Sequence, residues 1–124
     1  MNRDIREIIT LKVMDMCGPH CVGVEDGEFI FKKMLPILQS GTRVCLDFTD
    51  VLTVTSSFLN ASIGKLLGRF KEMDIDKQVR WKGLDENDVQ LVKLVIRNAK
   101  EHFAKSEKTR EVENKIVRHV LEEQ

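Results

Sequence analysis

The chain has 124 residues, of which 42% are hydrophobic and 32% are charged. This length and composition predict one soluble globular domain with a core of its own, and they exclude a disordered chain. Twenty basic and twenty acidic residues cancel to a net charge of +0, so no positive field favours the binding of nucleic acid.

The sequence shows no charged-then-apolar leader and no apolar run long enough to cross a bilayer. Its three cysteines, without an export signal, are typical of a reducing compartment. We therefore expect a cytoplasmic protein with free thiols, no metal and no cofactor.

The first third of the chain reads as two strands and a helix. An alternating pattern predicts a first strand over residues 5–14 and, after a Gly-Pro break, a short second strand over 21–24. A helix is expected from Asp26 to the Ser-Gly pair at 40–41. Pro36 lies within that helical pattern and predicts a kink or an early end.

The following elements continue the alternation. Residues 44–48 are apolar apart from Asp47, which predicts a central strand covered on both faces. A helix is expected over 57–71, a short strand over 78–82, and a helix capped by Asp85 that runs to residue 102. This order predicts an α/β sandwich with a mixed or parallel sheet of four to five strands.

A last amphipathic helix is expected over 109–123, after a polar break at 104–108. Its apolar positions are Val112, Ile116, Val117, Val120 and Leu121. A single helix of this length is marginal in water, so its apolar side must pack on something. The alternatives are its own domain, a second copy in a homodimer, or a partner protein. We expect a single domain over 1–124, with its core at about 5–104 and this helix as an addition.

Two serines stand between the central strand and the next helix. Ser56 and Ser57 fall where backbone N–H groups are unpaired and the helix dipole is positive. Such a position either receives a phosphate or is capped by its own side chains, and a Thr-Ser-Ser run supplies good N-caps. Both interpretations remain open from the sequence.

These residues carry a family resemblance. The segments Val44–Phe48, Ser56–Asn60 and Ile63–Leu66 resemble the STAS-like domains of bacterial proteins grouped as DUF4325, which are relatives of the anti-sigma-factor antagonists. The resemblance covers roughly residues 8–104, is sharpest over 44–70, and implies a STAS-like fold.

In the anti-sigma-factor antagonists, a serine opens the helix after the central strand. A partner serine kinase, which is also an anti-sigma factor, phosphorylates this serine and so switches binding off. The antagonists' Asp-Ser-Ser-Gly pattern falls on Thr55, Ser56, Ser57 and Phe58, so the carboxylate and the glycine are replaced here. The resemblance implies a kinase-like, ATP-binding partner, with Ser56, and Ser57 beside it, as phosphorylation candidates.

A strip of small side chains follows the serines. Asn60, Gly64 and Gly68 are spaced by four residues, and each glycine inside a helix costs about 1 kcal/mol relative to alanine. A flat strip allows close approach of either another element of the fold or a partner. The predicted partner-binding surface comprises Thr55, Ser56, Ser57, Asn60, Gly64 and Gly68.

A cysteine pair offers a second candidate chemistry. Three residues separate Cys17 from Cys21, whereas thioredoxin-type motifs have two, and Cys17 is expected after a strand rather than at a helix N-terminus. A metal site built on Cys17, His20 and Cys21 would need a fourth ligand. The pattern favours a Gly-Pro turn with buried thiols over redox or metal chemistry.

No constellation in the sequence supports catalysis, so we expect a regulatory module that binds another protein. Two alternatives stay open. One is a structural or oligomerisation subunit in which the serines are caps. The other is a sensor of a small anion or nucleotide at the same helix N-terminus.

Overall fold

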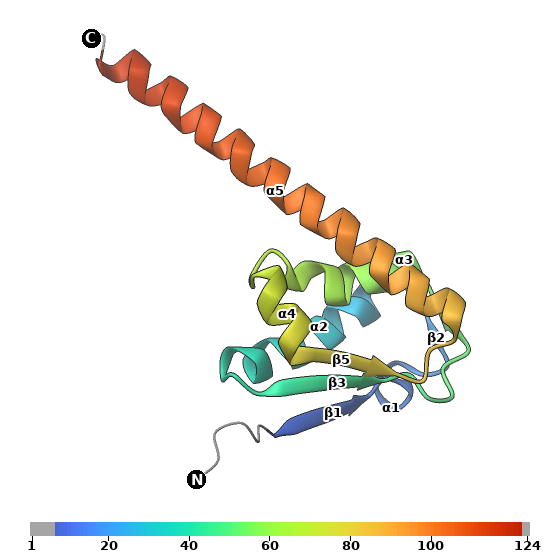
Figure 1. Ribbon diagram of the computed structural model, residues 1–124. Coiled ribbons are helices and arrows are strands. Elements are labelled where there is room, and N and C mark those ends of the chain that lie inside the picture. The colour runs from blue at the N-terminus through green and yellow to red at the C-terminus, as the bar shows by residue number, and fades with distance from the viewer. Residues whose placement is uncertain (1–6, 123–124) are drawn as a thin grey trace.

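The structure is a computed structural model that describes the backbone of residues 7–122 and the side chains of residues 7–105. Figure 1 shows a compact domain from which one long helix extends. The elements in chain order are β1 (Ile8–Lys12), α1 (Val13–Cys17), β2 (His20–Cys21), α2 (Val24–Gln39), β3 (Arg43–Asp47), β4 (Thr53–Val54), α3 (Ser56–Leu59), the π-helix η1 (Asn60–Gly64), α4 (Glu72–Gln78), β5 (Val79–Lys82) and α5 (Glu86–Glu122).

The strands form two separate parallel sheets. Strands β1, β3 and β5 make a three-stranded sheet in the order β1-β3-β5, and β2 pairs with β4. The predicted α/β class and parallel pairing are confirmed. The predicted single sheet of four to five strands is wrong, because β2 and β4 pair with each other beyond the carboxyl ends of β1 and β3 instead of joining the larger sheet.

The core lies between the three-stranded sheet and the helices on one side of it. Val44 and Leu46 of β3 and Val79 of β5 are buried in one hydrophobic core with residues of α2, η1 and α5. Figure 1 shows α2, α4 and α5 on one side of the sheet. Helix α2 contributes Ile30, Met34 and Leu38 to this core. The prediction that the central strand is covered on both faces is wrong, since Arg43, Cys45 and Asp47 alternate with the buried residues and remain partly exposed.

Several predicted boundaries shift. The first strand ends at Lys12, because residues 13–17 form α1, and β2 covers His20–Cys21 where a strand over 21–24 was expected. Helix α2 begins at Val24 instead of Asp26 and runs through Pro36. Pro36 lies in the last turn, so it disrupts the helix only near its end. Gly41 then ends the helix as predicted, with φ 83°.

In the second half of the chain, the structure has one helix that the sequence did not indicate. It also has a single continuous helix where the sequence predicted two. Helix α4 lies between the predicted helix that ends at 71 and the predicted strand that begins at 78, where no element was expected. Asp85 caps α5 as predicted, since its carboxylate accepts the N–H of Asp88 at 2.8 Å. The predicted break at 104–108 is absent: α5 is continuous over Glu86–Glu122, because those polar residues include no proline or glycine.

The separate helix predicted over 109–123 is therefore the distal part of α5, and Figure 1 shows this part extending past the rest of the domain. The side chains of its apolar positions at 112–121, and residue 123 itself, lie outside the residues that the structure describes.

Candidate functional site

Thr55 fixes the start of α3 to the second sheet. Its N–H donates to the carbonyl of Cys21 at 3.1 Å, and its hydroxyl donates to the carbonyl of Val22 at 2.9 Å. The same hydroxyl oxygen accepts the N–H of Phe58 at 3.3 Å, so Thr55 is the N-cap of α3. Replacing the antagonists' aspartate by threonine therefore keeps a cap at this position.

Ser56 and Ser57 are the first two residues of α3, and both are exposed. Within the part of the chain that the structure describes, neither hydroxyl takes part in a hydrogen bond, since capping is done by Thr55. Both hydroxyl groups are thus exposed and do not stabilise the domain through hydrogen bonds.

Phe58 occupies the position of the antagonists' glycine, but its side chain is not on the surface. It is fully buried and meets the ring of Phe48 edge to face, with the ring centroids 6.4 Å apart. The bulk of Phe58 therefore anchors α3 in the core and leaves the surface beside Ser57 open.

The strip of small residues packs largely inside the domain. A Cβ placed on Gly64 would lie 3.5 Å from Val95 Cγ1, and one placed on Gly68 would lie 2.7 Å from the Phe103 ring. Both neighbours belong to α5, so internal packing accounts for the glycine at 68, whereas a Cβ at position 64 would make only ordinary contact with α5. Gly64 is buried, whereas Asn60, near the serines, and Gly68, farther along the chain, are exposed.

Gly27 is a close-contact glycine that the sequence analysis did not single out. A Cβ on Gly27 would lie 2.5 Å from the Phe58 carbonyl oxygen and 2.7 Å from Ala61 Cβ. Helix α2 therefore packs against α3 and η1 at backbone distance. A glycine in the first turn of an amphipathic helix was the only signal of this contact in the sequence.

A π-helical turn, η1, begins three residues after Ser57. Ser62, which is fully buried within η1, donates from its hydroxyl to the Phe58 carbonyl at 2.9 Å. This carbonyl would otherwise serve the regular helical ladder, and such back-bonding is a recognised cause of helix distortion. The predicted regular helix over 57–71 is thus a short α-helix that widens into η1.

Exposed apolar side chains lie on the segments that lead to the start of α3 or meet it. Val22, Val24 and Leu52 are 47%, 52% and 75% exposed. Val24 and Ser57 line a shallow hollow of about 320 Å³ together with Asn60, Ala61 and Lys65. We call Val24, Leu52, Ser56, Ser57 and Asn60 the α3 surface. The sequence did not indicate its two apolar members: Val24 comes from a distant segment, and Leu52, four residues before Ser56, showed no signal of exposure.

An ion pair limits this surface on one side. Lys65 Nζ lies 3.0 Å from Glu28 Oε1, and this hydrogen bond lowers the pKa of Glu28. Because both side chains are exposed, the pair adds little to stability, but it fixes two opposite charges at the border of the α3 surface.

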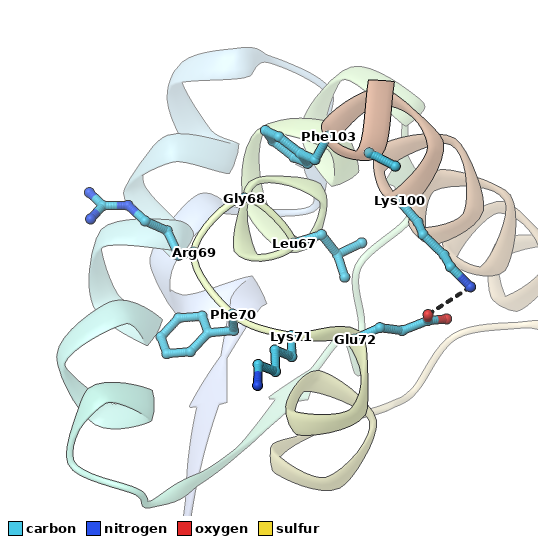
Figure 2. Close-up of a pocket in the computed structure, with 9 residues that line it drawn as sticks. Leu67, Gly68, Arg69, Phe70, Lys71, Glu72, Lys100 and Phe103 are labelled. Carbon is cyan, nitrogen blue, oxygen red and sulfur yellow. Dashed lines mark ion pairs between the residues drawn. The ribbon is translucent and has the colours of Figure 1, made fainter. Parts of the chain in front are cut away.

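A second hollow of about 340 Å³ lies where the turn after η1 meets α4 and α5 (Figure 2). Figure 2 shows Lys100 reaching Glu72 on one side, with N and O 2.8 Å apart, and Arg69 pointing away on the other. The pairing raises the pKa of Lys100. Contacts at Gly68 and Glu72 thus hold α5 against the domain, and this hollow is separate from the serines.

The cysteine pair lies beside the second sheet. Cys17 ends α1 rather than following a strand, and its thiol donates to the Asp26 carbonyl at 3.8 Å. Burial, with added repulsion from Cys21 and Asp26, raises the pKa of Cys17 to about 12. Burial, with added repulsion from Asp26, raises the pKa of Cys21 to about 11. Such thiols stay protonated, the opposite of a redox-active cysteine.

His20 does not join the cysteines in a ligand set. Its Nδ1 lies 2.9 Å from the hydroxyl of Thr53, across the pairing of β2 with β4. Among the described residues, no group of three or more His, Cys, Asp or Glu side chains is placed to hold a metal ion.

The fold and the site define an α/β domain of the STAS-like class, in which an exposed serine opens the helix after the central strand. A comparison with protein families matches residues 26–89 to the STAS-like domain of unknown function (DUF4325). This match spans just over half of the chain, from α2 to the first turn of α5. The chain therefore belongs to this family, which confirms the resemblance drawn from its sequence.

Neither a search of curated proteins nor a search of solved structures finds a match. In the described part of the chain, no helix combines the length and the apolar character needed to span a bilayer.

Proposed function

We propose that this chain is a non-enzymatic regulatory module, similar to the anti-sigma-factor antagonists, that binds a kinase-like, ATP-binding protein through the α3 surface. Phosphorylation of Ser56 by that partner, or by a related kinase, switches the binding off.

The observation that carries this proposal is that Thr55 caps α3 and the neighbouring Ser56 does not. Thr55 makes the capping hydrogen bond, so the Ser56 hydroxyl is exposed and is not needed for the fold. A kinase can therefore modify Ser56 without first breaking a structural hydrogen bond. Val24, which lines a hollow with Ser57, and Leu52, four residues before Ser56, have exposed apolar side chains, which are typical of a surface that is covered in a complex.

The charge of a phosphate explains how such a switch acts. Phosphoserine carries about −1.5 to −2 charges at neutral pH, and a partner that covers the α3 surface would have to desolvate them. A cost of a few kcal/mol lowers an affinity by roughly a hundredfold to a thousandfold. That is enough to separate a bound from an unbound state at ordinary protein concentrations.

The test is quantitative affinity capture, from the organism that encodes the chain, with tagged wild type and a Ser56→Asp variant. We expect an ATP-binding protein to be retained by wild type and lost with Ser56→Asp. Gln90→Glu is the matched control, since it adds the same charge at an exposed position of α5 and should retain the partner. Mass spectrometry of wild type from the same cells should show phosphate on Ser56.

Two further variants separate the surface from the switch. Leu52→Glu should lose the partner without any change at a serine, whereas Ser56→Ala should keep the partner and lose the phosphate. Equal capture by wild type, Ser56→Asp and Leu52→Glu would exclude the α3 surface as the binding site.

A structural or oligomerisation subunit is the second candidate, favoured by the length of α5. This helix has 37 residues and extends past the domain (Figure 1). An isolated helix in water gains little stability without packing, so the distal part is a natural place for a helix from another chain. Sedimentation equilibrium of the full chain tests this candidate. A monomer at all accessible concentrations would reject self-association.

A further inference from the structure

The three-stranded sheet has one face that no described element covers. Side chains alternate between the two faces of a strand, and Val44 and Leu46 of β3 point toward the helices. The alternate residues of β3 therefore point to the other side. Figure 1 shows α2, α4 and α5 together on the first side of the sheet.

Strand register defines the residues of this second face. Lys12, Asp47 and Lys82 align in one row across β1, β3 and β5, and Thr10, Cys45 and Arg80 align in the next. A third row pairs Ile8 with Arg43. We call these eight residues the open sheet face. Those on the edge strands are exposed, and those on the central strand are partly exposed.

An uncovered face is unusual for this kind of sheet. Purely parallel sheets occur almost only where both faces are covered, because their strands are connected by helices that pack against them. All the strand pairs in the larger sheet are parallel here. The open sheet face is therefore a surface that a further molecule is suited to cover.

The charge of this face indicates the chemistry of that molecule. Among the strand residues that the structure describes there, Lys12, Arg43, Arg80 and Lys82 are cationic and Asp47 is the one carboxylate. Asp47 accepts two hydrogen bonds from Thr49 and lies 3.9 Å from Lys82 Nζ, so it offsets part of that charge. Asp15 and Asp50 lie beside Lys12 and Asp47 at one end of the face. The eight residues themselves still carry a net positive charge, on a chain whose net charge is +0.

Two other occupants fit this surface less well. A second copy placed face to face would bring like charges together, which is unfavourable in a desolvated contact. Single-stranded nucleic acid is held on sheet faces by aromatic side chains that stack on bases. The aromatic residue of this sheet, Trp81, packs on the core side instead.

We propose that the open sheet face is a second docking surface, independent of the α3 surface, and that it binds an acidic protein surface. The small central side chains Thr10 and Cys45 allow close contact, and the lysines and Arg80 around them pair with carboxylates of the partner. The interaction is expected to weaken as salt is added, since the charges involved are exposed.

The test uses a short poly-L-glutamate as the acidic probe and the isotope-labelled full chain, followed by amide chemical shifts at low salt. Shifts should concentrate on β1, β3 and β5. The double variant Lys12→Glu/Lys82→Glu should bind the probe at least about tenfold more weakly, because it reverses two charges on the face. Lys32→Glu/Lys93→Glu, with the same charge change at exposed positions of α2 and α5, should bind like wild type.

The experiment has a distinct result for each of the other molecules that could bind this face. Equal weakening by both double variants, or shifts away from the sheet, would overturn the proposal. So would an oligothymidylate that binds this face as tightly as the acidic probe, or self-association that Lys12→Glu/Lys82→Glu abolishes. Lys12→Gln/Lys82→Gln repeats the test without charge reversal, and urea unfolding of every variant confirms that it is folded.

Discussion

Gly27→Ala is the substitution for which the structure gives the sharpest expectation. A Cβ at this position would lie 2.5 Å from the Phe58 carbonyl oxygen and 2.7 Å from Ala61 Cβ. Both distances are far below van der Waals contact, and the first involves backbone, so α2 must move away from α3 and η1.

The expected loss of stability follows from two opposing effects. Overpacking of a close helix contact costs about 1–3 kcal/mol, and the upper part of this range, about 2–3 kcal/mol, applies here because the Phe58 carbonyl is rigid backbone. Replacing glycine by alanine inside a helix returns about 1 kcal/mol. We therefore expect Gly27→Ala to lower the free energy of unfolding by about 1–2 kcal/mol, with an unchanged dependence on urea.

Gly64→Ala is the matched control. It is also a buried glycine in a helical segment, but an added Cβ would lie 3.5 Å from its nearest neighbours, which is ordinary contact. We expect it to be neutral or to stabilise by up to about 1 kcal/mol. Urea unfolding followed by the fluorescence of Trp81 measures both variants. A Gly27→Ala protein as stable as Gly64→Ala would refute the close contact of α2 with α3.

Three further predictions follow from the site and from the titrating groups. Thr55→Ala should destabilise the domain by about 1–2 kcal/mol in thermal unfolding, because it removes the cap, whereas Ser56→Ala should change stability by less than about 0.5 kcal/mol. Burial raises the pKa of Cys21 from 9.0 to about 11, so the unfolded chain loses this proton first and stability falls as pH rises above 9. Urea unfolding of Cys21→Ala between pH 9 and 11 should show a shallower fall, by about 1.4 kcal/mol per pH unit, and parallel curves would contradict this assignment. Hydrogen bonds from Thr49 lower the pKa of Asp47, so its contribution is present above the usual carboxyl pKa and is lost as pH falls through the lowered value. Acid titration should show Asp47→Asn less stable than wild type at neutral pH, with the difference shrinking below pH 3.8.

Local sequence signals predicted well where the deciding contacts are local. The cap at Asp85 and the helix end at Gly41 are both as expected. Each depends on residues within a few positions along the chain, whose preferences act on the backbone directly. The same local pattern around the serines also indicated the STAS-like family, which the family comparison confirms.

Signals that depend on distant partners were misread. A run of apolar residues at 44–48 cannot tell a strand covered on two faces from one covered on a single face. The glycines at 64 and 68 looked equally suited to a partner and to the fold until α5 was placed over them. Helix α4 was missed because its seven residues bury mainly Ile75 and show little periodicity.

The sequence by itself determined the α/β class, the family, and the position of a Thr-Ser-Ser run at the start of a helix, because these follow from short-range preferences of the backbone. It could not decide which of the three hydroxyls is the cap. That depended on the carbonyl of Val22, 33 residues earlier in the chain, which accepts the Thr55 hydroxyl and leaves Ser56 exposed. Only the tertiary structure also showed the open sheet face, since the cations on it come from three strands that lie far apart in sequence and meet only when the sheet forms.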